Sequence, residues 1–243
     1  MDVSYFLKER TKLIRYIFEN GEQPFREIQR KIGAEEEPFI PPYSEDSEPA
    51  FVAEWMDAEA AVELLGLSCI SMLSDSIKLY FNTLQSEIGF VFTPEEQKPQ
   101  KEKGVKVSKP GFVEMNAFAL GVILDTDWVD SHVDFGLVEQ IVLARNRVQH
   151  GEYLTSFRVQ HDPNTMNKFS RPYFISEAEE RDWNERDGDV DSFFKPHVEV
   201  GRDKLFAAIK EVEKLADYVD SQMDKAREWK RKARSAATVQ KQD

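Results

Sequence analysis

Three polar residues in the middle of the chain have the types and the spacing that phosphodiester chemistry needs. Arg145 and Asn146 are adjacent, and His150 follows after three further residues. A guanidinium offers forked hydrogen-bond donors to a phosphate, and an imidazole transfers protons near neutral pH. Together they suit cleavage by attack of a ribose 2′-hydroxyl on the adjacent phosphate, with the imidazole as base and the arginine stabilising the phosphoryl oxygens. This reaction requires no metal or other cofactor, and we expect none.

The apolar residues before the arginine predict a helix over about residues 134–150. Its apolar stripe consists of Phe135, Val138 and Val142. Three residues further on, the same stripe reaches Arg145. Residues five apart on an ideal helix lie about 140° from each other around the axis, so Arg145 and His150 would not share a face of an unbroken helix. Gly151 suits the position just after a helix end, and we expect it to let His150 turn back.

Apolar periodicity elsewhere predicts an all-α fold. A stripe that starts at Trp55 and ends at Leu79, in alternating steps of three and four, predicts a long core helix over residues 51–87. Further helices are expected over residues 112–124 and from about residue 202. Together these helices indicate a helical bundle that occupies residues 51–224.

The ends of the chain differ from this bundle. Residues 1–33 are predicted to be a helical extension, in which one helix ends near Asn20-Gly21 and Pro24 starts a second. Residues 34–50 contain four prolines and clustered acids, which is typical of an extended linker. Residues 225–243 carry seven bases against two acids and form a basic C-terminal tail.

One part of the bundle is less regular. Between residues 151 and 200 the pattern indicates a small insertion, with short strands at 171–175 and 197–200 and a charged helix at about 176–186. The remaining histidines have no arginine at the corresponding spacing and are expected at the surface or in loops: His132, His161 and His197.

The composition limits the possible classes of protein. Acidic residues outnumber basic ones by 45 to 32, a net charge of −13 that disfavours binding of nucleic acid through a broad basic surface. The excess is local, because eleven acids and no lysine or arginine lie between Ile32 and Ile77. The single cysteine, Cys69, excludes a disulfide-stapled scaffold. No signal peptide is visible and the apolar runs are too short to cross a bilayer, so we expect a cytoplasmic protein without a membrane partner.

The motif Arg145-Asn146-x3-His150, at the end of an apolar helix in a mostly helical chain, resembles the signature of the HEPN domain superfamily. That signature is an arginine followed a few residues later by a histidine, often with a polar residue directly after the arginine. The resemblance covers roughly residues 50–222, and only the short motif is specific. It implies a HEPN-like helical bundle, to which the N-terminal extension and the irregular insertion are additions.

Many members of this superfamily are metal-independent endoribonucleases of toxin–antitoxin or anti-phage systems. The resemblance implies that His150 is the catalytic base, that Arg145 stabilises the phosphate and that Asn146 shapes the site. It implies an RNA substrate, a homodimer with the motif at its interface, and a regulatory or antitoxin protein as a further partner. Arg147 and Arg158 are additional candidates for contacts with RNA.

Two other interpretations are open at this level. Arg145 and His150 can be purely structural, if the arginine pairs with Glu139 or Asp134 and the histidine caps the helix end. The acidic composition also suits a non-catalytic HEPN-like module that binds a partner protein or a nucleotide. An RNA-cleavage assay separates this module from the endoribonuclease.

Overall fold

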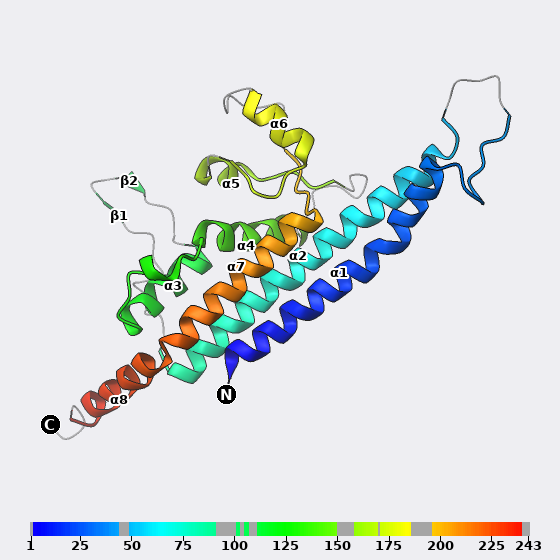
Figure 1. Ribbon diagram of the computed structural model, residues 1–243. Coiled ribbons are helices and arrows are strands. Elements are labelled where there is room, and N and C mark those ends of the chain that lie inside the picture. The colour runs from blue at the N-terminus through cyan, green and yellow to red at the C-terminus, as the bar shows by residue number, and fades with distance from the viewer. Residues whose placement is uncertain are drawn as a thin grey trace. The chain divides into compact units, whose positions relative to one another are not determined.

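The computed structural model describes residues 2–43, 49–90, 101–102, 105–106, 111–149, 158–169, 171–185 and 196–239. Within these ranges the fold is all-α, as predicted, apart from a two-stranded antiparallel ladder of β1 (Lys101–Glu102) and β2 (Val105–Lys106). Figure 1 shows the helices, which are α1 (Val3–Gly33), α2 (Val52–Ile88), α3 (Phe112–Ile123), α4 (Phe135–Gln149), α5 (Pro163–Lys168), α6 (Glu177–Glu185), α7 (Arg202–Ser221) and α8 (Met223–Val239). A short 3₁₀ helix, η1, spans Val129–Ser131.

The chain forms two compact units, and several helices contribute to both. Unit 1 comprises Met1–Thr11, Ser74–Val142 and Ala207–Asp243. Unit 2 comprises Lys12–Leu73 and Leu143–Phe206. The motif arginine and asparagine therefore belong to unit 2, whereas the first half of their helix belongs to unit 1.

Helix α1 is continuous through Gly21 and Pro24, so the predicted break at this point is wrong. Contacts with α2 explain why the helix continues. Before the proline, the Cys69 thiol lies 4.0 Å from the carbonyl oxygen of Ile14, and after it Arg26 pairs with Glu59 at 2.9 Å. Packing on both sides of Pro24 outweighs the hydrogen bond that the proline removes.

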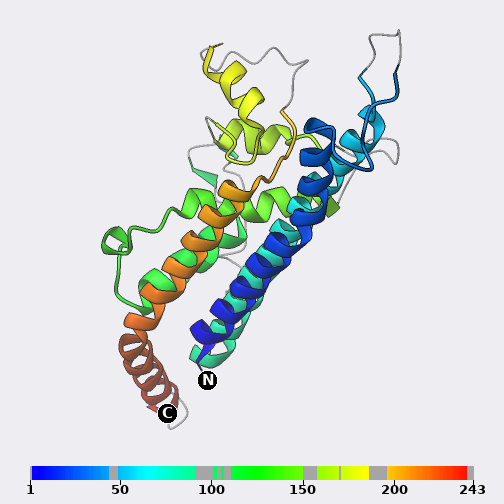
Figure 2. The ribbon, with the colours of Figure 1, turned by 45° about the vertical axis from the view of Figure 1, so that its right-hand side comes forward.

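In unit 2, α1 and α2 run antiparallel, and they lie side by side in both ribbon views (Figures 1 and 2). Phe18 of α1 is fully buried and meets the ring of Phe206 edge to face, with 6.0 Å between the ring centroids. Ile70 and Leu73 of α2 are also fully buried. These side chains belong to the core of unit 2.

The long helix predicted over 51–87 is confirmed as α2, but the ends of its predicted stripe are exposed. Ala58, Val62 and Cys69 are buried, whereas Trp55 and Leu79 are 44% and 51% exposed. A stripe of alternating three- and four-residue steps has a period of about 3.5, and an α-helix has about 3.6 residues per turn. Over the length of α2 this difference rotates the stripe away from the core.

Unit 1 contains the predicted helix α3 and the first half of α4, and both helices lie within a residue or two of their expected bounds. Phe81 of α2 and Phe112 of α3 meet edge to face with 5.9 Å between their centroids. Leu120 of α3 and Ile141 of α4 are fully buried. The last predicted helix begins at Arg202 as expected, but a turn at Gln222 divides it, and the described part of the basic tail, residues 225–239, lies in α8.

The irregular insertion contains the expected charged helix, α6, but no strands among its described residues. Gln160 and His197 form an isolated antiparallel bridge. Val198 donates a backbone hydrogen bond to Val159 at 2.7 Å, and Glu199 donates to Phe174 at 3.1 Å. The extended segments therefore pair, but over too few residues to make a ladder.

Two further features bear on the expectations from sequence. The described parts of the predicted linker, residues 34–43 and 49–50, contain no regular secondary structure, and residues 44–48 lie outside the described ranges.

Helix α2 is, among the described helices, the one long and apolar enough to cross a membrane by length and composition alone. Half of its most apolar window is buried inside the protein.

Candidate active site

The end of α4 carries the motif residues that the structure describes. The helix begins after Asp134, whose carboxylate accepts the backbone N–H of Leu137 at 3.0 Å. Val138, Ile141 and Val142 then bury one face. Arg145 and Asn146 follow on the last turn and are half-buried. A half-buried guanidinium at the edge of an apolar face is held in place by its surroundings, which favours a fixed position for its donors.

Arg145 and Asn146 contact each other. The Nη1 atom of Arg145 donates to the Oδ1 atom of Asn146 at 3.4 Å, a long hydrogen bond between neighbours on one turn. The amide can therefore orient one arm of the guanidinium fork. His150, the predicted base, and Gly151 lie outside the described residues. The structure thus places the arginine and the asparagine, whereas the histidine is located only by its position in the sequence.

Arg147 anchors a second segment to the end of α4. Its Nε atom donates to the backbone carbonyl oxygen of Gln160 at 2.8 Å. The Arg147 side chain is half-buried. Arg147 therefore has a structural contact in addition to any role in binding RNA, because it holds residues 158–161 against the motif helix.

The anchored segment contains a buried histidine. His161 lies in an irregular segment, one of the two positions expected for it, but it is 3% exposed and therefore not at the surface. Its Nε2 atom lies 2.8 Å from the carbonyl oxygen of Phe174, and its backbone N–H donates to Pro196 at 2.9 Å. Burial lowers the pKa of His161 below the ordinary 6.5, so the neutral ring with a proton on Nε2 fits this site. His161 joins three segments of the insertion and is not a candidate base.

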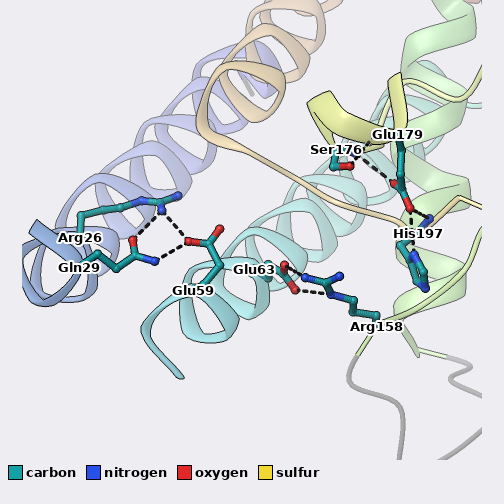
Figure 3. Close-up of polar contacts among 8 residues, drawn as sticks. All are labelled: Arg26, Gln29, Glu59, Glu63, Arg158, Ser176, Glu179 and His197. Carbon is teal, nitrogen blue, oxygen red and sulfur yellow. Dashed lines mark hydrogen bonds and ion pairs between the residues drawn. The ribbon is translucent and has the colours of Figure 1, made fainter. Parts of the chain in front are cut away.

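Arg158, the second predicted RNA contact, forms an ion pair with Glu63 of α2. Figure 3 shows the two side chains facing each other, with both carboxylate oxygens engaged. The distances are 2.8 Å from Nη2 to Oε1 and 3.3 Å from Nε to Oε2. The Arg158 side chain is 62% exposed, so it is accessible to a ligand, but Glu63 competes for the guanidinium.

Further carboxylates surround this pair. Glu199 is half-buried, and its burial together with Glu63 and Glu179 raises its pKa. Glu179 accepts both the backbone N–H and the Nδ1 atom of His197, at 3.1 and 2.9 Å (Figure 3). Burial raises the pKa of Glu179, but these hydrogen bonds outweigh burial, and the pKa is lowered.

Sequence reasoning missed this group of carboxylates, because its members come from α2, from α6 and from the segment before α7. One local signal was readable. Ser176 and Glu179 form a reciprocal capping box at the start of α6: the Ser176 hydroxyl accepts from the Glu179 N–H at 3.0 Å, and the Glu179 carboxylate accepts from the Ser176 N–H at 3.3 Å. Among the described residues, no three histidine, cysteine or acidic side chains are grouped so that they could hold a metal ion.

Comparisons with protein-family models, with curated proteins and with solved structures give no match to this chain.

Proposed function

We propose that this chain is a HEPN-type, metal-independent endoribonuclease, and that the end of α4 is its active site. The observation that carries the proposal is the half-buried pair of Arg145 and Asn146 on the last turn of α4, in an all-α fold. His150 follows the last residue of this helix in the sequence. The pair presents a guanidinium whose orientation a neighbouring amide constrains. This arrangement suits a group that must bind a phosphate in one geometry.

In the proposed mechanism, His150 takes the proton of a ribose 2′-hydroxyl. The 2′-oxygen forms a bond to the adjacent phosphorus, and the bond from phosphorus to the 5′-oxygen of the next nucleotide breaks as that oxygen gains a proton. Arg145 stabilises the charge that develops on the phosphoryl oxygens. The products are a 2′,3′-cyclic phosphate and a 5′-hydroxyl end.

The proposal includes a homodimer in which two copies of the motif face each other. On one continuous helix, positions 145 and 150 point about 140° apart, so an arginine and a histidine from different subunits meet more easily than two from one subunit. We propose a cytoplasmic toxin–antitoxin or anti-phage setting with an RNA substrate and a regulatory or antitoxin protein as partner.

The decisive experiment is RNA cleavage by the full-length protein in EDTA, with analysis of the ends produced. The proposal expects cyclic phosphate ends from the wild type and no cleavage by His150→Ala, with an unchanged circular dichroism spectrum. His132→Asn is the matched control, since His132 is exposed and its left-handed backbone (φ 51°) tolerates asparagine. Cleavage by His150→Ala at the wild-type rate would overturn the assignment.

A second candidate function, a non-catalytic module for a partner protein, is favoured by an exposed apolar face on α1. Leu13, Tyr16 and Ile17 share one side of the helix and are 58%, 62% and 42% exposed. Contiguous exposed apolar side chains mark surfaces that another protein covers. If the wild type cleaves no RNA under any activating condition, yet co-purifies in a fixed ratio with a protein encoded next to it, this function replaces the first.

A further inference from the structure

A pocket of about 750 Å³ lies within unit 1, whereas Arg145 and Asn146 belong to unit 2. Its walls are one face of α3, the turn over residues 125–128, and the end of α7 with the start of α8. The volume falls in the range of small-ligand sites. Nothing in the proposed ribonuclease mechanism uses this pocket.

The turn that forms one wall is fixed to α3 by close contacts. A Cβ atom on Gly121 would lie 3.0 Å from Nε1 of Trp128 and 3.1 Å from the carbonyl oxygen of Thr126, so a larger residue would require the turn to move by a few tenths of an ångström. The Trp128 indole donates to the carbonyl oxygen of Ala117 at 2.9 Å. The hydroxyls of Thr126 and Tyr218 are hydrogen-bonded at 2.5 Å. The pocket is therefore preformed by paired polar groups.

Two kinds of side chain line this pocket, and the first is apolar and aromatic. Phe118 and Val122, one turn apart on α3, are 68% and 63% exposed. The rings of Trp128 and Tyr218 lie beside each other, with 5.5 Å between their centroids. Exposed apolar surface of this kind favours a ligand with a carbon chain, and aromatic faces attract organic cations.

The second kind of lining is acidic. Asp125, Asp127 and Asp130 lie along the turn and are exposed. The single basic side chain of the lining is Lys225, whose Nζ atom lies 3.4 Å from the backbone carbonyl oxygen of Asp125. Three carboxylates against one ammonium leave a negative pocket. Such a pocket repels phosphates and nucleic acid and attracts cations.

We propose that this pocket binds an organic cation: one or more alkylammonium groups joined by an apolar chain. The carboxylates of the turn receive the ammonium groups, and the chain lies against Phe118, Val122 and Trp128. A bare metal ion does not fit equally well, because it gains nothing from the apolar wall. Two sources offer this chemistry: a free polyamine and a lysine side chain of a polypeptide.

Isothermal titration calorimetry with spermidine and the full-length protein tests the proposal. We expect saturable binding of spermidine and no binding of 1,8-octanediol, a neutral chain. We also expect Mg²⁺ to compete little with spermidine when the two are compared at equal charge concentration. In Asp127→Asn the amide oxygen can replace the carboxylate oxygen that accepts the Val129 N–H at 3.1 Å, and this variant should weaken spermidine binding about fivefold. Phe118→Ala, which changes an exposed side chain, should weaken it by a similar factor.

Matched controls separate the pocket from bulk charge and bulk hydrophobicity. Asp224→Asn removes the same charge from an exposed position outside the lining, and Val129→Ala shortens an exposed apolar side chain outside it. Neither should change the affinity for spermidine. The proposal is wrong if spermidine does not bind, if Asp224→Asn weakens binding as much as Asp127→Asn, or if Mg²⁺ displaces spermidine at equal charge.

A further titration, with a short acetylated and amidated peptide of alternating lysine and glycine, identifies the source of the cation. Tighter binding of the peptide than of spermidine assigns the pocket to a polypeptide partner, and the reverse order assigns it to a free polyamine. All of these measurements are independent of RNA cleavage, so they stand whether or not the chain is a ribonuclease.

Discussion

Gly66 of α2 lies directly against the backbone of Val200: a Cβ atom added at Gly66 would be 2.2 Å from the Val200 carbonyl oxygen. Both residues are buried in unit 2. A glycine in the middle of a helix costs about 1 kcal/mol relative to alanine, and here it allows the segment before α7 to touch the helix. That contact sets the position of residues 196–200 on α2.

Replacing Gly66 by alanine should therefore destabilise the protein, although alanine is the better helix former. Because the atom in the way belongs to the backbone, the helix and the segment must separate, and we expect a loss of about 2–3 kcal/mol in the free energy of unfolding. Urea denaturation followed by circular dichroism measures it. Gly33→Ala is the control, since a Cβ there meets nothing within 4 Å and should leave the midpoint unchanged or higher. Equal midpoints for both variants would contradict the contact.

Arg202 should be the most important ion-pairing residue in unit 2. It pairs with Glu22, which is only 8% exposed, contacts Glu19 at 3.1 Å and lies 4.8 Å from the ring centroid of Phe206. Arg202→Ala leaves the Glu22 carboxylate buried without this partner. We expect a loss of about 2 kcal/mol, less than for a fully buried pair because the Arg202 side chain is 46% exposed.

Two measurements check this prediction. The thermal unfolding midpoint of Arg202→Ala should be lower than that of the wild type. Arg227→Ala breaks an exposed pair with Asp224 and should leave the midpoint unchanged. The loss at Arg202 should also shrink in the background of Glu22→Gln, because the neutral amide no longer requires a cation. An undiminished loss in that background would show that Glu22 is not the reason.

His161 should make the protein less stable in mild acid. Its pKa in the folded state lies below the ordinary 6.5, so the unfolded chain binds more protons between these two values. The free energy of unfolding therefore rises with pH through that window and falls on acidification below 6.5. Glu199, whose pKa is raised, has the opposite effect: above its ordinary pKa of 4.5 it lowers the free energy of unfolding as the pH rises. All the variants compared contain Glu199, so this effect is the same in each.

The test compares the pH dependence of stability between pH 5 and pH 7.5 in three proteins. His161→Gln, whose amide nitrogen can still donate to Phe174, should flatten the dependence relative to the wild type. His132→Asn changes an exposed histidine and should show the same pH dependence as the wild type. The same slope in His161→Gln and in the wild type would rule out this histidine as the source.

The motif arginine should be required for its forked donors and not only for its charge. If the proposed function holds, Arg145→Lys lowers the single-turnover rate of RNA cleavage about a hundredfold with an unchanged fold. Asn146→Ala, which removes the acceptor of the 3.4 Å hydrogen bond, should have a smaller effect, about tenfold. Arg231→Ala on α8, an exposed change, serves as the control.

A mixing experiment tests whether the site combines residues of two subunits. Arg145→Lys should retain about a hundredth of the activity and His150→Ala none. A mixed dimer of the two, however, has one site with a wild-type arginine and a wild-type histidine if these come from different subunits. Random mixing should then restore about a quarter of the wild-type activity. No restoration after verified subunit exchange would place both residues of a site in one subunit.

The ion pair between Arg158 and Glu63 predicts opposite effects of two substitutions on RNA binding. In the inactive His150→Ala background, Arg158→Gln should weaken binding and lower its salt dependence by about one unit of slope. Glu63→Gln releases the guanidinium from its 2.8 Å pair and should strengthen binding. Filter binding of a short RNA at several salt concentrations measures both. Weaker binding in both variants would mean that the pair itself, and not the free arginine, is what RNA contacts.

The sequence by itself determined most of the helices and the candidate motif. Apolar periodicity and terminal residues are local properties, so α2, α3 and α4 were predicted close to their observed bounds, and the charged helix α6 was as well. The spacing of Arg145, Asn146 and His150 is likewise a local pattern. It was readable without knowing what packs around it.

Only the tertiary structure decided the features that depend on long-range packing. Packing against α2 kept α1 continuous past Pro24, where local propensity predicted a break. Contacts across the insertion buried His161, and Glu63 reached Arg158 from 95 residues away in the chain. A side chain's exposure and partners depend on chain segments that are distant in sequence. No local pattern specifies which distant residue fills the space beside it.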